Sequence, residues 1–365
     1  MHINLRCVNQ TISVSLLFLL LLLVNGCAEF LLGTPKASFT CSPNTCYCQQ
    51  QMTFDASGCL GGNDEIVQYA WAFGDGTTAS GARVTHGYPS AGTYQVRLSI
   101  TTEHGQQALA TRSVHIAEGL VVPTVYPTIQ AAIDAAENGD VVVVLPGTYQ
   151  ESITFRGKAI TVQSTNPSDP SVVAGTVILG AEPGRSVVNI GNGSTVTLAG
   201  FTIKGGGTSF DPCPPCAGGV YIREASPTIR GNHIVDHSNG AMAVIESDAR
   251  IVDNLIANNT KGSAGAGIYI DSYLIAPSIV GNTFENNTAP SAAGIYITAT
   301  TTDDTPATAA RTVVSDNTFT DNTSTSFGGA AIFVEFSGNL LLDTPDSNTY
   351  SGNAPDNIFY TVPPT

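Results

Sequence analysis

Candidates for chemistry lie in a short apolar strand motif that recurs along the second half of the sequence. Alternation within Val220-Tyr-Ile-Arg223 directs two side chains inward and two outward. Applied to each repeat, it predicts two outward columns. The first holds Tyr221, Val244, Tyr269, Tyr296 and Phe333, and the second holds Arg223, Glu246, Asp271, Thr298 and Glu335.

Three charged members of the second column, Arg223, Glu246 and Asp271, are the candidate catalytic residues. If successive repeats lie about 4.8 Å apart, Glu246 and Asp271 are neighbouring carboxylates. Their like charges would raise one pKa or attract Ca²⁺. No cofactor is otherwise predicted. A separation of about 5 Å falls in the range of retaining glycosidases, and Arg223 would serve an elimination as base or as electrostatic stabiliser. No metal ligands are assigned.

The aromatic members of the first column, Tyr221, Tyr269, Tyr296 and Phe333, are the candidate substrate-binding residues. Aromatic faces beside polar groups suit a sugar chain. The alternative is structural: the rings stack to stabilise an exposed sheet, and the charges keep it soluble.

Two further columns consist of asparagines. One holds Asn232, Asn254, Asn282, Asn317 and Asn348, and the other holds Asn259, Asn287, Asn322 and Asn353, with His237 in place of the first member. Stacked repeats would align these side chains at corners, where each hydrogen-bonds to the next coil. His233 and His237 have metal-ligand spacing only on a helix, so we favour the corner interpretation.

The elements that position these columns form a solenoid. The strand motif recurs at intervals of 23 to 37 residues, and the longest interval contains the polar insertion from Ala299 to Ala310. Before the repeats, Thr128 to Glu137 has the apolar spacing of a short helix with Thr128 as N-cap, and Val141 to Leu145 is typical of a buried strand.

The segment YPTIQAAIDAAENGDVVVVLPGTYQ and the later STVTLAGFTIKGG and GNxF units resemble the pectate-lyase-like right-handed β-helix superfamily. The resemblance covers residues 120–365 and implies a parallel β-helix with an N-terminal capping helix. That superfamily includes lyases, hydrolases, esterases, epimerases and proteins without known catalysis, and none of its catalytic signatures occurs here. Whether the chain is an enzyme therefore stays open.

Residues 34–117 show a second pattern, with alternating segments and glycine-rich turns typical of a β-sandwich. Trp71 to Gly76 (WAFGDG), His86-Gly-Tyr88 and Gly92-Thr-Tyr-Gln-Val96 closely resemble the motifs of a PKD domain. The resemblance implies an immunoglobulin-like spacer or binding module. The predicted fold class is thus all-β, a sandwich followed by a β-helix. Asp75 and His86 are interpreted as turn and packing residues.

The N-terminus predicts export. An apolar stretch from Ile12 to Val24 is too short to span a bilayer, and Leu23-Val-Asn-Gly-Cys27 resembles a lipobox, so residues 1–26 would be a signal peptide and Cys27 the lipidated first residue. The alternative is ordinary secretion. The net charge of -15 disfavours nucleic acid as a partner. In an oxidising compartment disulfides are the default for the remaining cysteines, Cys41, Cys46, Cys48, Cys59, Cys213 and Cys216.

The sequence therefore favours a lipid-anchored protein of the cell envelope that binds, with or without processing, a polysaccharide along the β-helix. One alternative is a non-catalytic adhesin or envelope protein with a surface protein as its partner. Another is a polysaccharide lyase or glycoside hydrolase.

Overall fold

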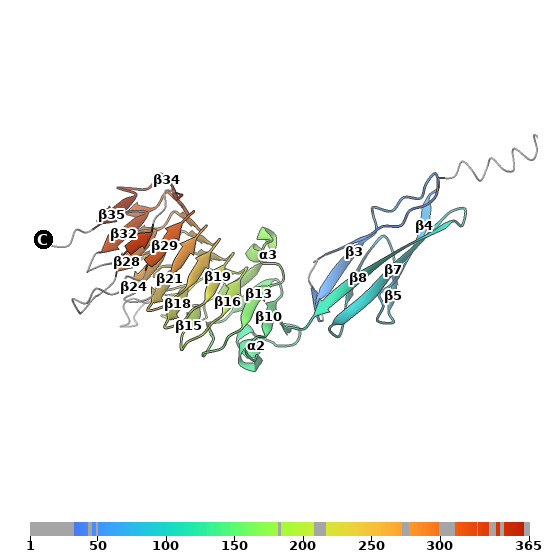
Figure 1. Ribbon diagram of the computed structural model, residues 1–365, viewed down its shortest axis with the longest axis horizontal. Coiled ribbons are helices and arrows are strands. Elements are labelled where there is room, and N and C mark those ends of the chain that lie inside the picture. Colours follow the sequence, from blue (N-terminus) through green and yellow to red (C-terminus); the bar gives the residue numbers. More distant parts are fainter. Residues whose placement is uncertain are drawn as a thin grey trace, which may run out of the picture. The chain divides into compact units, whose positions relative to one another are not determined.

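The computed structural model describes residues 33–42, 46–48, 50–181, 184–207, 217–271, 277–298, 311–326, 328–335, 341–343 and 347–360. The chain divides between Ala117 and Glu118 into two compact units (Figure 1). Within the described residues, no helix has both the length and the apolar character needed to cross a membrane. Each unit is built almost entirely from strands.

The first unit is a small sandwich of two sheets. One has the order β1 (Thr40–Ser42), β3 (Gln51–Asp55), β6 (Arg83–Gly87), and the other β2 (Cys46–Tyr47), β8 (Gln107–Ala117), β7 (Gly92–Thr102), β4 (Ile66–Ala72), β5 (Thr78–Ser80). The predicted alternation in β7 is confirmed, because Val96, Leu98 and Ile100 are fully buried while Arg97 between them is exposed. These residues pack with Trp71 and other rings into one core.

Asp75 and His86 act in this unit as turn and packing residues. The Asp75 carboxylate accepts hydrogen bonds from the backbone N–H and hydroxyl of Thr77, and its other oxygen lies 2.7 Å from Nε2 of His86. The His86 ring stacks on Phe73 with centroids 4.1 Å apart. Burial alone would raise the pKa of Asp75, but the hydrogen bonds from Thr77 and His86 outweigh it and hold that pKa below its usual value.

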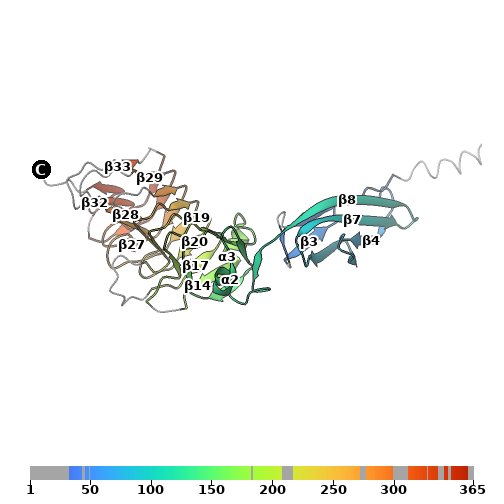
Figure 2. The same ribbon diagram turned by 60° about the horizontal axis from the view of Figure 1, so that its bottom comes forward.

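The second unit begins with the predicted helix. In α2 (Ile129–Ala135) the Thr128 side chain accepts a hydrogen bond from the backbone N–H of Ala131, and Ile129, Ala132 and Ile133 are buried. Figures 1 and 2 show α2 and a second short helix, α3 (Pro170–Gly175), at the green, N-terminal end of the stacked coils. The apolar face of α2 therefore closes this end of the core, as a capping helix should.

Three parallel sheets form the walls of a β-helix, and each contains one strand per coil. Sheet A contains β9 (Leu120–Val122), β10 (Val141–Val144), β13 (Thr161–Ser164), β16 (Thr197–Ala199), β19 (Thr228–Arg230), β22 (Arg250–Val252), β25 (Ser278–Val280), β29 (Arg311–Ser315) and β33 (Leu341–Asp343). Sheet B contains β11 (Gly147–Gln150), β14 (Thr176–Leu179), β17 (Thr202–Lys204), β20 (His233–Val235), β23 (Leu255–Ala257), β26 (Thr283–Glu285), β30 (Thr318–Thr320) and β34 (Thr349–Ser351).

Sheet C, which carries the predicted site, contains β12 (Ile153–Thr154), β15 (Val188–Ile190), β18 (Val220–Arg223), β21 (Met242–Ile245), β24 (Ile268–Asp271), β28 (Ile295–Thr298), β32 (Ile332–Glu335) and β35 (Ile358–Tyr360). A small pair of strands, β27 (Thr288–Ala289) and β31 (Thr323–Ser324), lies at a corner. All neighbouring strands of the three walls are parallel and in register, which aligns equivalent side chains of successive coils.

Two buried asparagine ladders hold the corners together, as the sequence predicts. In the first, the side-chain oxygen of Asn282 accepts from both the backbone and side-chain N–H groups of Asn254, and the Asn282 amide donates to Asn317 in turn. The second ladder runs through Asn259 and Asn287 with the same geometry. Because each side chain replaces a hydrogen bond lost at the corner, the coils can turn sharply without leaving buried backbone groups unpaired.

Candidate functional site

Sheet C carries three stacked aromatic side chains on its outward face, which we call the aromatic strip: Tyr269, Tyr296 and Phe333. They pair in register along β24, β28 and β32. The ring centroids of each neighbouring pair are 5.4 Å apart, and the ring planes are within 15° of parallel. Tyr269 and Tyr296 are partly exposed, whereas Phe333 is almost covered. From Tyr269 onward the first column is therefore the one that strand alternation predicts.

The prediction was wrong in the coil before the strip. Tyr221 pairs with Ala243, and Ala243 pairs with Tyr269, so Ala243 rather than Val244 occupies the outward column. Val244 points inward and is fully buried. Ala243 has no ring, so Tyr221 is separated from the aromatic strip by one coil.

The same register moves Glu246 out of the second column. Ile245 stands between Arg223 and Asp271, and Glu246 follows the end of β21 with a backbone φ of 45°. Its backbone N–H donates to the carbonyl of Asp271. The structure therefore does not bring Arg223, Glu246 and Asp271 together as one row, and the expected neighbouring pair of carboxylates is not formed.

The signal for the correct register is the small residue that precedes each strand. Gly219, Ala241, Gly267, Gly294 and Ala331 occupy equivalent positions. A side chain at Gly267 would come within 2.3 Å of the Gly294 carbonyl, and one at Gly294 within 2.2 Å of the Ala331 carbonyl. Alignment on these residues, in place of the apolar triplet that follows them, would have assigned Ala243 and Ile245 correctly.

Polar groups lie beside the aromatic strip. The Tyr296 hydroxyl donates to the Glu335 carboxylate. Burial, together with the charges of Asp271 and Glu335, raises the pKa of Tyr269 to about 12. Burial and the hydrogen bond to Glu335 also raise the pKa of Tyr296. Both phenols thus stay protonated at neutral pH and keep their hydrogen-bonding O–H groups.

Lys261, which sequence reasoning missed, is a further member of the site. Its ammonium group lies 5.0 Å from the centroid of the Tyr269 ring, within cation–π range, and the residue is only 8% exposed. It is the only lysine after Lys204, and it stands in a loop otherwise composed of small and polar residues. That isolation is the one sequence signal that could have drawn attention to it.

Asp271 and Arg223 have different surroundings. Burial raises the pKa of Asp271, and its Oδ1 atom is buried without a hydrogen-bond partner among the described residues. The cause is desolvation and not a neighbouring Glu246 carboxylate, which corrects the expected like-charge effect. Arg223 is exposed and forms an ion pair of 3.1 Å with Glu224.

His237 is a structural residue. It is fully buried at the start of the second ladder, where its Nδ1 accepts from the Gly206 backbone and its Nε2 faces the Ile203 carbonyl at 3.1 Å. Burial lowers the pKa of His237 to about 4. Because both ring nitrogens are occupied, a metal site shared with His233 is not formed. No cluster of three or more potential metal ligands occurs in the described part of the chain.

The four cysteines that the structure describes are free thiols. Cys41, Cys46, Cys48 and Cys59 form no disulfide, and the Sγ atoms of Cys48 and Cys59 instead approach the carbonyls of Ala117 and Ser38 at 3.4 and 3.1 Å. Burial raises the pKa of Cys46 to about 12. The structure does not support the predicted staples among these four. The other cysteines with predicted roles, Cys27, Cys213 and Cys216, lie outside the described residues.

Comparison with protein families matches residues 33–117 to the PKD domain and residues 173–354 to the right-handed beta helix region. The chain is a PKD domain followed by a right-handed β-helix. The PKD domain indicates an extracellular protein. Among curated proteins, 84 residues are 37% identical to a microbial collagenase from Vibrio alginolyticus, covering 23% of this chain and 10% of the collagenase. The chain spans a tenth or less of the length of the curated collagenases that it matches.

Each of the two units is similar to a solved structure. The PKD1 domain of the Vibrio cholerae metalloprotease PrtV is 25% identical, with a TM-score of 0.21, and the match covers 23% of this chain and 96% of that domain. An alginate lyase from a Paenibacillus species is 14% identical, with a TM-score of 0.33, and the match covers 64% of this chain and 95% of the lyase.

Proposed function

We propose that this extracellular protein binds polysaccharide along the outward face of sheet C. The observation that carries the proposal is the aromatic strip, in which Tyr269, Tyr296 and Phe333 present stacked rings across three coils. Stacked rings supply apolar area for the C–H faces of sugars, and the phenol and carboxylate groups beside them hydrogen-bond to hydroxyls. The partly exposed Tyr296, in the middle of the strip, is the central contact.

The polar rim supports the same proposal. Asp271 is partly exposed and lies on the same strand as Tyr269, where its carboxylate can accept a hydrogen bond from a sugar hydroxyl. Lys261 and Glu335 place charges of opposite sign at the strip. A hydroxyl-rich chain accepts and donates at many positions, so it can satisfy both kinds of group in successive coils.

The test is a glycan array on the full chain, with affinities for the best ligands measured in buffer with and without Ca²⁺. Replacing Tyr296 by Ala removes about 50 Å² of contact, worth about 1.3 kcal/mol or roughly tenfold in Kd. Tyr296→Phe keeps the ring and should retain most of the affinity. Leu109→Ala, at a side chain of the first unit that is 63% exposed, is the control. Loss of affinity in the control but not in Tyr296→Ala would refute the proposal.

The same samples separate binding from catalysis. Absorbance at 235 nm reports elimination products, and a reducing-end assay reports hydrolysis. Activity lost in Asp271→Asn or Arg223→Gln would make those residues catalytic, as the sequence predicts. Binding without product supports a carbohydrate-binding protein. Absence of both binding and product would overturn the proposal in favour of an adhesin or scaffold.

We also propose that Cys27 carries a lipid anchor, on the lipobox-like sequence Leu23 to Cys27. Expression in a bacterium with a radiolabelled fatty acid should label the wild-type chain, and Cys27→Ser should abolish both the label and partitioning into detergent. Cys7→Ser, within the predicted signal peptide but before its apolar stretch, is the matched control. An unlabelled wild-type chain recovered in the culture medium would show ordinary secretion.

A further inference from the structure

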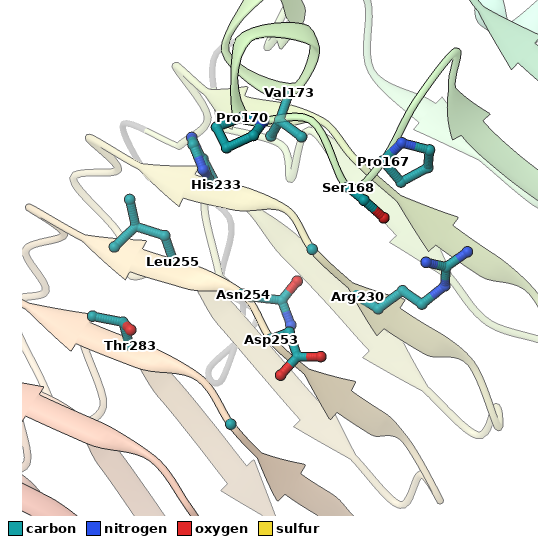
Figure 3. A pocket seen from close by; sticks show the side chains of 12 residues that line it. Pro167, Ser168, Pro170, Val173, Arg230, His233, Asp253, Asn254, Leu255 and Thr283 are labelled. Atoms are coloured by element: carbon teal, nitrogen blue, oxygen red, sulfur yellow. The ribbon is translucent and has the colours of Figure 1, made fainter. Parts of the chain in front are cut away.

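A further candidate site, separate from the aromatic strip, lies at the corner where sheet A turns into sheet B. It is a cleft of about 390 Å³, within the roughly 300 to 1,000 Å³ of small-molecule sites. Figure 3 shows its two walls. The coil corner supplies Arg230, His233, Asp253 and Leu255, and the segment around α3 supplies Pro167, Ser168, Pro170 and Val173. We call it the corner cleft.

The overhanging wall of the corner cleft is firmly attached. Val173 of α3 is 3% exposed, and its carbonyl accepts a hydrogen bond of 3.0 Å from the hydroxyl of Thr202 in β17. Asp169 caps the first turn through the backbone N–H of Ser171. The α3 wall of the cleft is therefore held in place by hydrogen bonds to its own cap and to sheet B.

The coil-corner wall of the cleft carries two charged side chains, Arg230 and Asp253, that do not bind each other. Arg230 ends β19 and pairs in register with Val252, so Asp253 lies one coil further along and one residue later. No ion pair joins Arg230 to Asp253, and neither side chain has a hydrogen-bond partner among the described residues. A guanidinium and a carboxylate on adjacent coils that do not bind each other are free to bind a third group.

A glycine makes room for the carboxylate. At Gly281, with φ of 69°, a Cβ atom would stand 2.4 Å from Oδ1 of Asp253. The Asp253 side chain thus lies over the next corner, in space that only a glycine leaves open. His233 adds a half-buried imidazole, and its burial lowers its pKa, so it is neutral at pH 7 and offers one donor and one acceptor.

We propose that the corner cleft binds the carboxylated sugar of an acidic saccharide, a hexuronate residue. Arg230 would pair with the sugar carboxylate, for which the planar guanidinium offers two parallel N–H donors. Asp253, His233 and Thr283 would hydrogen-bond to ring hydroxyls. Pro170 and Leu255 provide the apolar surface for the ring's C–H groups. This site is separate from the aromatic strip and does not depend on the strip's function.

The experiment titrates the full chain with digalacturonate and diglucuronate and follows binding by ligand-observed NMR. Cellobiose and lactose are the uncharged comparisons. Each titration is run on the wild-type chain and on Tyr296→Ala, which lacks the central ring of the aromatic strip, so that binding at the cleft can be told from binding at the strip. Wild-type protein should bind at least one uronate with a Kd about tenfold or more below that of either neutral disaccharide. Arg230→Gln should weaken binding by about tenfold or more, and Asp253→Asn should weaken it as well.

The matched control is Arg250→Gln, which removes the same charge from an exposed arginine of sheet A, one coil further on, outside the cleft lining. Its Kd should stay within about twofold of the wild-type value. Equal losses in Arg230→Gln and Arg250→Gln would show a general charge effect and overturn the cleft proposal, as would equal affinity for cellobiose. The loss caused by Arg230→Gln should be the same when Tyr296 is also replaced by Ala, so the cleft and the aromatic strip can fail independently.

Discussion

Replacing Asn282 by Ala tests whether the asparagine ladder holds the coils together. Asn282 is 1% exposed, and its side chain takes part in five hydrogen bonds. Its oxygen accepts from the backbone and side chain of Asn254. Its amide donates to the carbonyls of Ile251 and Val280 and to the side chain of Asn317.

The expected loss is smaller than five bonds, because several partners keep another contact. The Asn254 amide still donates to the carbonyls of Ile229 and Val252. The Asn317 oxygen still accepts from the Asn282 backbone. The group that loses its partner outright is the Asn254 backbone N–H. The Ile251 carbonyl keeps its hydrogen bond in the parallel ladder between β22 and β25. At about 1 to 3 kcal/mol for a buried group left unsatisfied, the free energy of unfolding of the β-helix should fall by about 2 kcal/mol.

The assay is urea denaturation followed by two probes. Trp71, the only tryptophan, lies in the core of the PKD domain, so its fluorescence reports the first unit. Far-UV circular dichroism is dominated by the β-helix. Asn282→Ala should shift the dichroism transition and leave the fluorescence transition in place. Asn286→Gly is the matched control: Asn286 is exposed, has φ of 52° and approaches only Glu285 through its side chain. A loss below about 1 kcal/mol in Asn282→Ala, or an equal loss in the control, would refute the reasoning.

Three other results are expected. The folded pKa of His237, about 4, lies below the unfolded value of about 6.5. The contribution of His237 to the free energy of unfolding is therefore full above pH 6.5 and declines by about 3 kcal/mol as the pH falls toward 4. His237→Asn, which places the ladder's usual residue there, should remove that part of the pH dependence in denaturation curves. Thr128→Ala deletes the hydrogen bond to Ala131 and should cost about 1 kcal/mol, measured in the same way. Gly281→Ala should strain the corner and displace the Asp253 carboxylate, so uronate binding should weaken while the response to Tyr296 variants is unchanged.

The repeated features of the fold could be predicted because the same residue types recur at equivalent positions in successive coils. The asparagine columns appear at each corner in the sequence, and the structure shows each buried side chain bonded to the next coil. His237 was recognised as a ladder member for the same reason. The α3 helix occurs in one coil only, so the repeat pattern does not predict it. Its local signal is weak: Asp169 before Pro170 is a cap followed by a residue suited to a first turn.

The corner cleft could not be predicted from local pattern. Its walls come from Pro167 and Asp253, more than eighty residues apart, and neither is part of a periodic column that includes the other. They come together because α3 follows β13 and extends over the corners of the later coils, which include the corner after β22. The repeat pattern predicts the column in which each residue lies, but it does not predict which residues an insertion such as α3 covers.

The register also bears on the functions considered for sheet C. In the second column Thr298 lies between Asp271 and Glu335, which places these two carboxylate residues two rungs apart, about 9.6 Å along the backbone. A retaining glycosidase needs carboxylates about 5 Å apart, which the displaced Glu246 does not supply. The rings, by contrast, continue without a gap from Tyr269 through Tyr296 to Phe333. The continuous feature of this face is the one that we propose contacts sugar rings, and we expect variants of the aromatic strip to affect affinity more than variants of Arg223 or Glu246.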